Sequence, residues 1–183
     1  MLAGVVEQEA LARHEAPTPR TRARPIIDDT VLPEAAMYLR LYRGTADYFW
    51  RFLGDLEAEG LNWRPEAEAA NSLFVLASHS FANIERNVLH HFAGRPYEWR
   101  REREFAGRGD SIEPLRKHWA RLEPELRAVL DAATLDDLDR EYDHPNMGRP
   151  TGREVLVRAV THAREHVGHA GLTRDLWNAT HAL

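Results

Sequence analysis

One stretch near the carboxyl end of the chain reads Val160-Thr161-His162-Ala163-Arg164-Glu165-His166-Val167-Gly168-His169. Its three imidazoles recur at spacings of four and then three residues, which on an α-helix places them within an arc of roughly 60°. Two histidines four residues apart on a helix can bind one divalent cation together. Such a site needs at least one further ligand, so the pattern predicts another ligand from elsewhere in the fold.

The composition limits the classes of function that remain. With 183 residues and 43% hydrophobic content, the chain is long enough for one domain with a substantial core. The formal net charge of −5 argues against nucleic acid as a partner, because phosphate binding normally needs clustered positive charge. There is no cysteine, so metal ligands must be nitrogen or oxygen and any reacting thiol must come with the substrate.

The sequence also argues against a membrane location. Glu7 and Glu9 lie where a signal peptide would need an apolar run, and the longest uncharged stretch, residues 69–84, is interrupted by polar side chains. We therefore expect a cytoplasmic protein with no membrane partner.

Four segments have helical character, and together they predict an all-α four-helix bundle over residues 28–183. Residues 1–27, with alternating prolines and arginines, are expected to form a partly irregular N-terminal arm. The expected helices begin near Asp28-Asp29-Thr30, at Asn71-Ser72, at Ser111 and at Thr151, and the first two end at Gly60 and Gly94. Pro124 should kink or split the third helix. Residues 141–148 are expected to form a turn or small hairpin, with Gly148 available for positive φ.

His79 is the histidine outside the fourth helix that is best placed to reach the core. It lies in the middle of the second expected helix among small neighbours, which leave room for an imidazole to approach another helix. Helical-wheel positions place His79, Asn83, Arg86 and His90 along one polar stripe beside the apolar face.

At these residues the chain resembles a known family, the DinB/YfiT-like proteins. The resemblance covers roughly residues 30–177. It rests on the order and separation of short motifs: Ala77-Ser78-His79-Ser80-Phe81-Ala82-Asn83-Ile84-Glu85-Arg86, Leu138-Asp139-Arg140, Thr151-Gly152-Arg153-Glu154-Val155-Leu156 and His162-Ala163-Arg164-Glu165-His166-Val167-Gly168-His169.

The resemblance implies a four-helix bundle that holds one divalent cation through His79, His162 and His166. Characterised relatives include S-transferases and isomerases that use low-molecular-weight thiols, and members are often dimeric, so a thiol and a second copy of the chain are the expected partners. His169 stands where many relatives have glutamine. Its role as a fourth ligand, a hydrogen-bond donor to a ligand or a substrate contact is left open.

The chemistry of the residues points the same way. Three neutral imidazoles leave a coordination position open for water or substrate, which is typical of a catalytic site. Zinc or nickel is the expected ion. Arg86 and Asn83 could bind an anionic substrate or a developing oxyanion, and His169 or His90 could transfer a proton. The expected catalytic residues are therefore His169 and Arg86, and the expected substrate-binding residues are Asn83, Arg86 and His90.

These patterns predict a metal-dependent enzyme that acts on a small molecule, and the resemblance implies a thiol-dependent S-transferase or else a hydrolase or isomerase. Two alternatives remain open. One is a non-catalytic metal-binding bundle with a structural, dimerisation or sensing role, and the other is a partner-binding module that uses the arm. Single residues also have plainer interpretations, because a lone histidine such as His79 is often a hydrogen-bonded core residue and Arg86 could be a salt-bridged surface residue.

Overall fold

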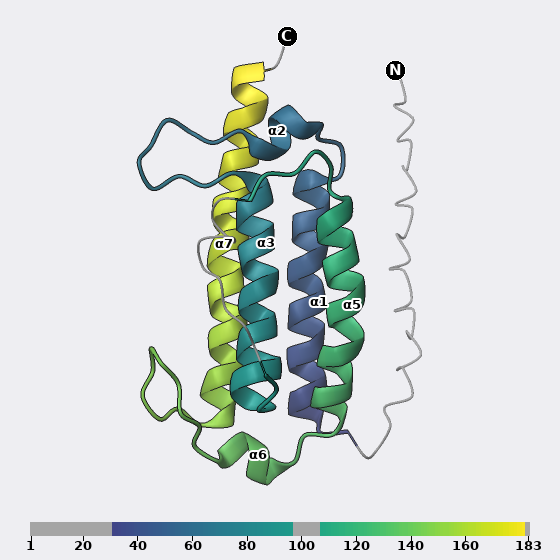
Figure 1. Cartoon of the computed structure of the whole chain (residues 1–183), viewed down its shortest axis with the longest axis vertical. Helices are drawn as coiled ribbons and strands as arrows, with labels where there is room; N and C mark the ends of the chain where they lie inside the picture. Colours follow the sequence, from purple (N-terminus) through teal and green to yellow (C-terminus); the bar gives the residue numbers. More distant parts are fainter. Residues whose placement is uncertain (1–30, 97–106, 182–183) are drawn as a thin grey trace, which may run out of the picture.

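Four long helices run side by side in the computed structural model, which describes residues 31–96 and 107–181 (Figure 1). Helices α1 and α7 run in one direction and α3 and α5 in the other, and the short helices α2 and α6 lie at opposite ends of the bundle. Their bounds are α1 Pro33–Leu53, α2 Ala58–Asn62, α3 Leu73–Glu85, α5 Glu113–Asp131, α6 Leu135–Asp139 and α7 Gly152–His181. The predicted all-α four-helix bundle is confirmed. The predicted arm, residues 1–27, lies outside the described residues.

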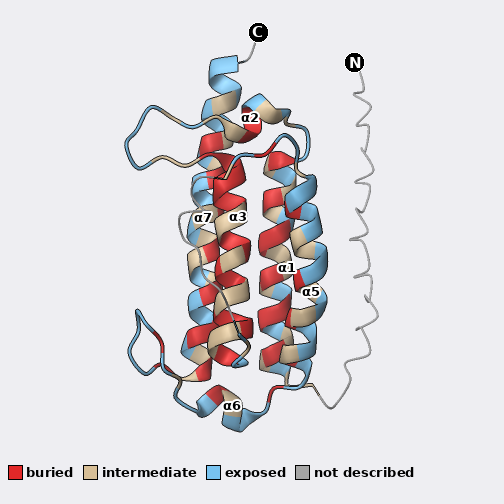
Figure 2. Ribbon diagram, in the orientation of Figure 1, coloured by how far each residue is buried: buried red, intermediate tan, exposed pale blue. Residues whose placement is uncertain are grey.

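The core lies between the four long helices, as the distribution of buried residues shows (Figure 2). Phe81 of α3 links three of them, because its ring centroid lies 5.7 Å from that of Phe49 in α1 and 5.1 Å from that of Trp119 in α5. On α1 the buried residues recur at helical spacing and form one stripe: Ala35, Tyr38, Leu39, Tyr42, Thr45, Ala46, Phe49 and Leu53. Helix α3 packs most extensively on α7, so these two helices form the closest pair in the bundle.

One predicted helix end is wrong, and the predicted split of another helix does not occur. The first helix ends at Leu53, not at Gly60, and Gly60 lies inside α2. A Cβ atom at Gly60 would meet Trp177 at 3.1 Å and Leu56 at 2.7 Å, so this glycine permits close packing instead of ending a helix. Pro124 does not split the third helix either, because α5 runs unbroken through it. Leu122 and Leu126, on either side of Pro124, are fully buried, and their packing offsets the lost backbone hydrogen bond.

The second predicted helix has the expected ends but an unexpected middle. Ser72 caps α3 by accepting a hydrogen bond from the Val75 amide at 3.3 Å, and the helical segment stops before Gly94, whose φ is 69°. Its last seven residues, Arg86–Phe92, form a π-helix, labelled η1. Since a π-helix has wider turns than an α-helix, side chains after Glu85 leave the positions that an α-helical wheel assigns to them.

The connection between α6 and α7 folds as a small hairpin-like turn, as predicted. Isolated antiparallel bridges pair Glu141 with Thr151 and His144 with Gly148, and Gly148 has a φ of 71°. No helix in the described part of the chain is both long enough and apolar enough to cross a bilayer.

Candidate metal centre

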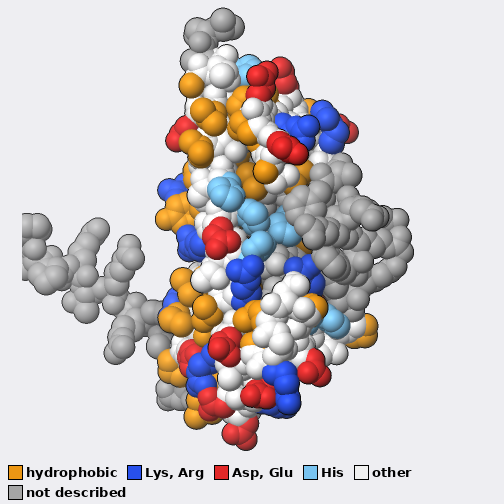
Figure 3. Space-filling view, turned by 90° about the vertical axis from the view of Figure 1, so that its left-hand side faces the viewer, with side chains coloured by type: hydrophobic (Ala, Val, Ile, Leu, Met, Phe, Trp, Pro, Cys, Tyr) orange, Lys and Arg blue, Asp and Glu red, His pale blue; other side chains and the backbone are white. Residues whose placement is uncertain are grey.

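Three histidines meet where α3 faces α7. His79 Nε2 lies 2.9 Å from His162 Nε2, and His166 Nε2 lies 3.2 Å from the same atom. The three potential ligand atoms all lie within 4.8 Å of one another, and the three rings are partly buried. Histidine side chains gather at mid-height on this face of the molecule, next to basic side chains (Figure 3). The sequence-predicted group of His79, His162 and His166 is therefore together in space.

The donor set suits a divalent cation. In a tetrahedral site with bonds of about 2.1 Å, ligand nitrogens lie about 3.4 Å apart, close to the spacings observed here. All three histidines present the same ring atom, Nε2, to a common point. Three imidazole nitrogens suit zinc, nickel and other first-row ions, so the geometry fits a metal without selecting one.

Burial and mutual repulsion keep two of these rings uncharged at neutral pH. Burial first, and then the neighbouring His79 and Arg158, lower the pKa of His162 to about 4. Burial first, and then His162 and His79, lower the pKa of His166 to about 4. A metal ligand must be a neutral imidazole, so both rings are already in the state that binding requires.

The second nitrogens of the two α7 rings differ in their surroundings. His162 Nδ1 lies 3.8 Å from Glu165 Oε2, which places a carboxylate on the far side of the ring from the other histidines. A carboxylate in this position can fix the tautomer of a ligating histidine. His166 Nδ1 is buried and has no hydrogen-bond partner within residues 31–96 and 107–181. Sequence reasoning did not assign Glu165 a role, although its spacing of three from His162 was visible.

His169 lies next to the three-histidine group but not within it. Its ring centroid is 5.6 Å from that of His166, and the side chain is exposed. It also lines a mainly apolar cavity between the segment before α3 and helix α7. Its proposed catalytic role stays a prediction.

The other predicted substrate contacts lie on α3 and on η1. Asn83 is buried, and its side-chain oxygen accepts a hydrogen bond from Asn87 Nδ2 at 3.1 Å. His90 Nδ1 lies 2.7 Å from the carbonyl oxygen of Arg95, at the end of η1. Arg86 is the first residue of η1 and is partly exposed. Because η1 has wider turns than an α-helix, the wheel that aligned His90 with His79 does not apply beyond Arg86, and the substrate-binding roles of Asn83, Arg86 and His90 stay predictions.

A second histidine group, which the sequence reasoning missed, lies at the end of η1. The rings of His91 and His144 are 4.3 Å apart, and His144 Nε2 lies 3.1 Å from Asn87 Oδ1. His91 Nε2 is buried and has no hydrogen-bond partner in the part of the chain that the structure describes. Burial, and then the charges of His144, His90 and Arg86, lower the pKa of His91 to about 4. The sequence placed His91 on a helix surface and His144 in a loop, and nothing local indicated that the two would meet.

Comparison with known proteins identifies the class. The sequence profile of the DinB superfamily matches residues 41–170, and the chain belongs to that superfamily. A solved structure described as a conserved protein from Enterococcus faecalis has a similar fold, with a TM-score of 0.64 and 19% sequence identity. The likeness covers 79% of this chain and 97% of that one. The comparison with curated proteins returns no match.

Proposed function

We propose that this protein is a divalent-metal-dependent enzyme in which His79, His162 and His166 hold the cation. The observation that carries the proposal is the convergence of three Nε2 atoms from two helices on one point. A closed structural site uses four protein ligands, whereas three leave a position for a reacting molecule. Membership of the DinB superfamily supports the same proposal.

The proposed reaction is the transfer of a low-molecular-weight thiol to an electrophilic substrate, with hydrolysis or isomerisation as related possibilities. A bound cation would supply Lewis-acid activation of a thiol or of water at the open position. The thiol must be exogenous, because the chain has no cysteine. An imidazole near the centre is needed to accept the thiol proton, and His169, adjacent to His166, is the residue we assign to that step.

Charge around the centre favours an anionic substrate or transition state. Arg86 and Arg158 both act on the pKa of His162, and Arg158 precedes His162 by one helical turn. A guanidinium at this position can pair with a carboxylate or a developing oxyanion. We therefore assign Arg86 to substrate binding and to charge stabilisation, and add Arg158 as a second basic residue.

Metal content is the direct test of the centre. Protein stripped with a chelator is reloaded with zinc or nickel, freed of excess ion and examined by elemental analysis. We expect about one ion per chain in the wild type and less than about a tenth of that in His79→Ala and His166→Ala. His181→Ala, at the far end of α7, is the matched control and should retain the ion. Equal content in all four proteins would overturn the proposal.

Activity is tested with the loaded protein against a panel of electrophiles and several low-molecular-weight thiols. We expect thiol consumption that requires the metal and falls at least about tenfold in His169→Ala while metal content is kept. Unchanged turnover in His166→Ala would show that the reaction does not depend on the metal.

A non-catalytic role is the second candidate, and one observation favours it. The three histidines come from α3 and α7, so a shared ion would cross-link the two helices that pack most extensively. A ligand that binds only the folded state stabilises it, so metal removal would lower the melting temperature. Metal-dependent stability with no turnover across the whole panel would favour this candidate.

A further inference from the structure

An apolar cavity of about 470 Å³ adjoins the three-histidine group. It is lined by Leu76 of α3, by His169, Leu172 and Leu176 of α7, and by Ala69 and Ala70 of the segment before α3. Leu76 precedes His79 by three residues, and His169 follows His166 by three. Because α3 and α7 run in opposite directions, both steps lead to the same end of the groove (Figure 1).

The cavity has the character of a small-molecule site. Its volume lies within the range of about 300–1,000 Å³ found for ligand pockets, which are mostly apolar with a few polar groups. Leu172 and Leu176 belong to it, yet their side chains are 61% and 38% exposed. Leaving large apolar side chains in contact with water has a free-energy cost that a bound apolar group would remove.

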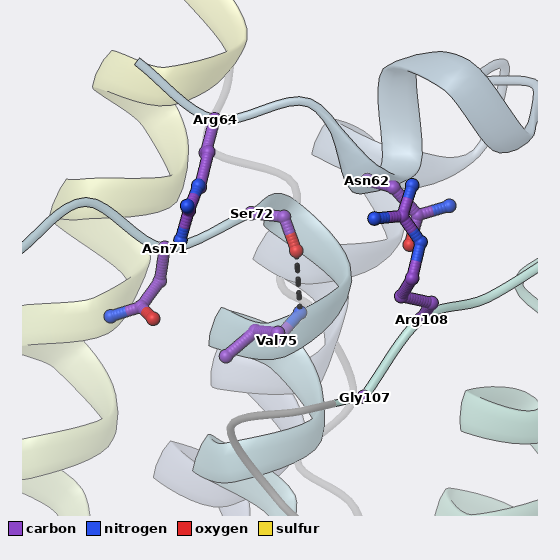
Figure 4. Close-up of a pocket in the computed structure, with 7 residues that line it drawn as sticks. All are labelled: Asn62, Arg64, Asn71, Ser72, Val75, Gly107 and Arg108. Atoms are coloured by element: carbon purple, nitrogen blue, oxygen red, sulfur yellow. Dashed lines mark hydrogen bonds between the residues drawn. The ribbon is translucent and has the colours of Figure 1, made fainter. Parts of the chain in front are cut away.

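A second cavity near the same end of the bundle differs in chemistry. It measures about 250 Å³ and is lined mainly by polar and basic residues, among them Asn62, Arg64 and Arg108 (Figure 4). Arg64 and Arg108 lie on opposite sides of Ser72 and do not converge. This polar cavity therefore offers no equivalent place for an apolar group.

We propose that the apolar cavity receives an alkyl or aryl group of the substrate while the reacting atoms of the same molecule lie at the three histidines. The position of His169 carries this step, since its ring neighbours His166 on one side and forms part of the cavity wall on the other. The substrate class is then a small molecule with an apolar group next to its electrophilic or metal-binding atom. The placement of the reacting atoms rests on the proposed function, whereas the binding of an apolar group in the cavity does not.

The cavity is tested first without metal. Chelator-treated, full-length protein is titrated with the neutral apolar fluorophore N-phenyl-1-naphthylamine. We expect saturable binding that weakens at least about tenfold in Leu172→Asp and Leu176→Asp, because the cavity wall becomes charged. Both side chains are partly or largely exposed, so the variants should fold, which circular dichroism would verify. Val157→Asp is the matched control, since Val157 lies on the same helix, is 45% exposed and lines a different hollow.

The link to the histidines is tested with metal-loaded protein and a series of straight-chain alkyl hydroxamates, measured by calorimetry. We expect the dissociation constant to fall about threefold to fourfold per added methylene until the cavity is full, and this dependence to vanish in Leu172→Asp. A series with no dependence on chain length would overturn the link. Two results would overturn the assignment of the cavity as a binding site. One is an equal loss of fluorophore affinity in Leu172→Asp and Val157→Asp, and the other is a fluorophore affinity that decreases as the protein concentration rises.

The two proposals fail in different ways. If the hydroxamates bind equally well with and without metal, the metal-dependent function fails, while the fluorophore result still decides the cavity. If the shortest hydroxamate binds only with metal but chain length has no effect, the metal centre stands and the present inference fails.

Discussion

One group of close-packed histidines lies between α3 and α7 and another lies at the end of η1, and they differ in what their nitrogens face. In the candidate metal centre, His79, His162 and His166 direct Nε2 atoms at one another. In the second group, His144 directs Nε2 at the carboxamide of Asn87, and this contact fastens the 141–148 turn to η1. Rings in both groups have pKa values lowered by burial. The two groups are thus alike in proximity and burial and differ in whether their nitrogens converge.

The largest expected contrast concerns metal affinity. His162→Ala removes the central nitrogen of the first group and should weaken binding of zinc or nickel more than about 100-fold. His144→Ala removes a ring from the second group and should leave the affinity unchanged. Competition with a chromogenic chelator measures both constants. Similar losses in the two variants would show that the groups are not distinct.

Stability without metal should show the reverse contrast. His144→Ala leaves the buried Asn87 Oδ1 without the donor that His144 provides, and should lower the free energy of unfolding by about 1–3 kcal/mol. His162→Ala, which releases no loop, should cost less. Urea unfolding in the presence of a chelator gives both values. A larger loss in His162→Ala would mean that the first group is the structural one.

Acid should reveal the contribution of His91. Its pKa is about 4 in the folded protein and about 6.5 when unfolded, so between these values the unfolded chain binds more protons. The stability that neutral His91 contributes is complete above pH 6.5 and is lost as the pH falls towards 4. In metal-free protein, His91→Gln should therefore flatten the fall of unfolding free energy over this window. An unchanged slope would contradict the buried, uncharged state of His91.

The smallest effects come from two glycines, one near each group. Gly148 has a φ of 71°, so Gly148→Ala should destabilise the chain by about 1 kcal/mol through backbone strain alone. Gly168 lies in α7 with open space around it, so Gly168→Ala should stabilise the chain by about 0.5–1 kcal/mol. Thermal unfolding of both variants, with metal content as a control, tests the opposite signs. Destabilisation by Gly168→Ala would contradict the packing described around the metal centre.

The sequence was sufficient to predict the three-histidine group because its geometry is mostly local. The spacing of His162 and His166 fixes both on one face of α7, and the small neighbours of His79 identify the facing position on α3. The four-helix bundle follows from apolar periodicity in the same way. The ligand roles of these histidines and the proposed dimer and cytoplasmic location stay predictions.

The remaining features depend on contacts between segments distant in the chain. The meeting of His91 with His144 depends on how the 141–148 turn docks, and the apolar cavity depends on where residues 65–71 lie against α7. The π-helical winding of η1 is not visible in the apolar periodicity, because a helical wheel assumes one pitch throughout. The sequence pattern predicts a helix end at Gly60 because a local pattern cannot show the contact with Trp177. That contact joins two segments far apart in the chain.

The wide turns of η1 also bear on how this protein can tolerate changes in length. A π-helical turn holds more residues than an α-helical one, so a residue added or removed between Arg86 and Phe92 can be absorbed by a change in winding. The preceding turns, from Ser72 to Glu85, would keep their orientation towards α7. Insertions and deletions within η1 are thereby decoupled from the position of His79.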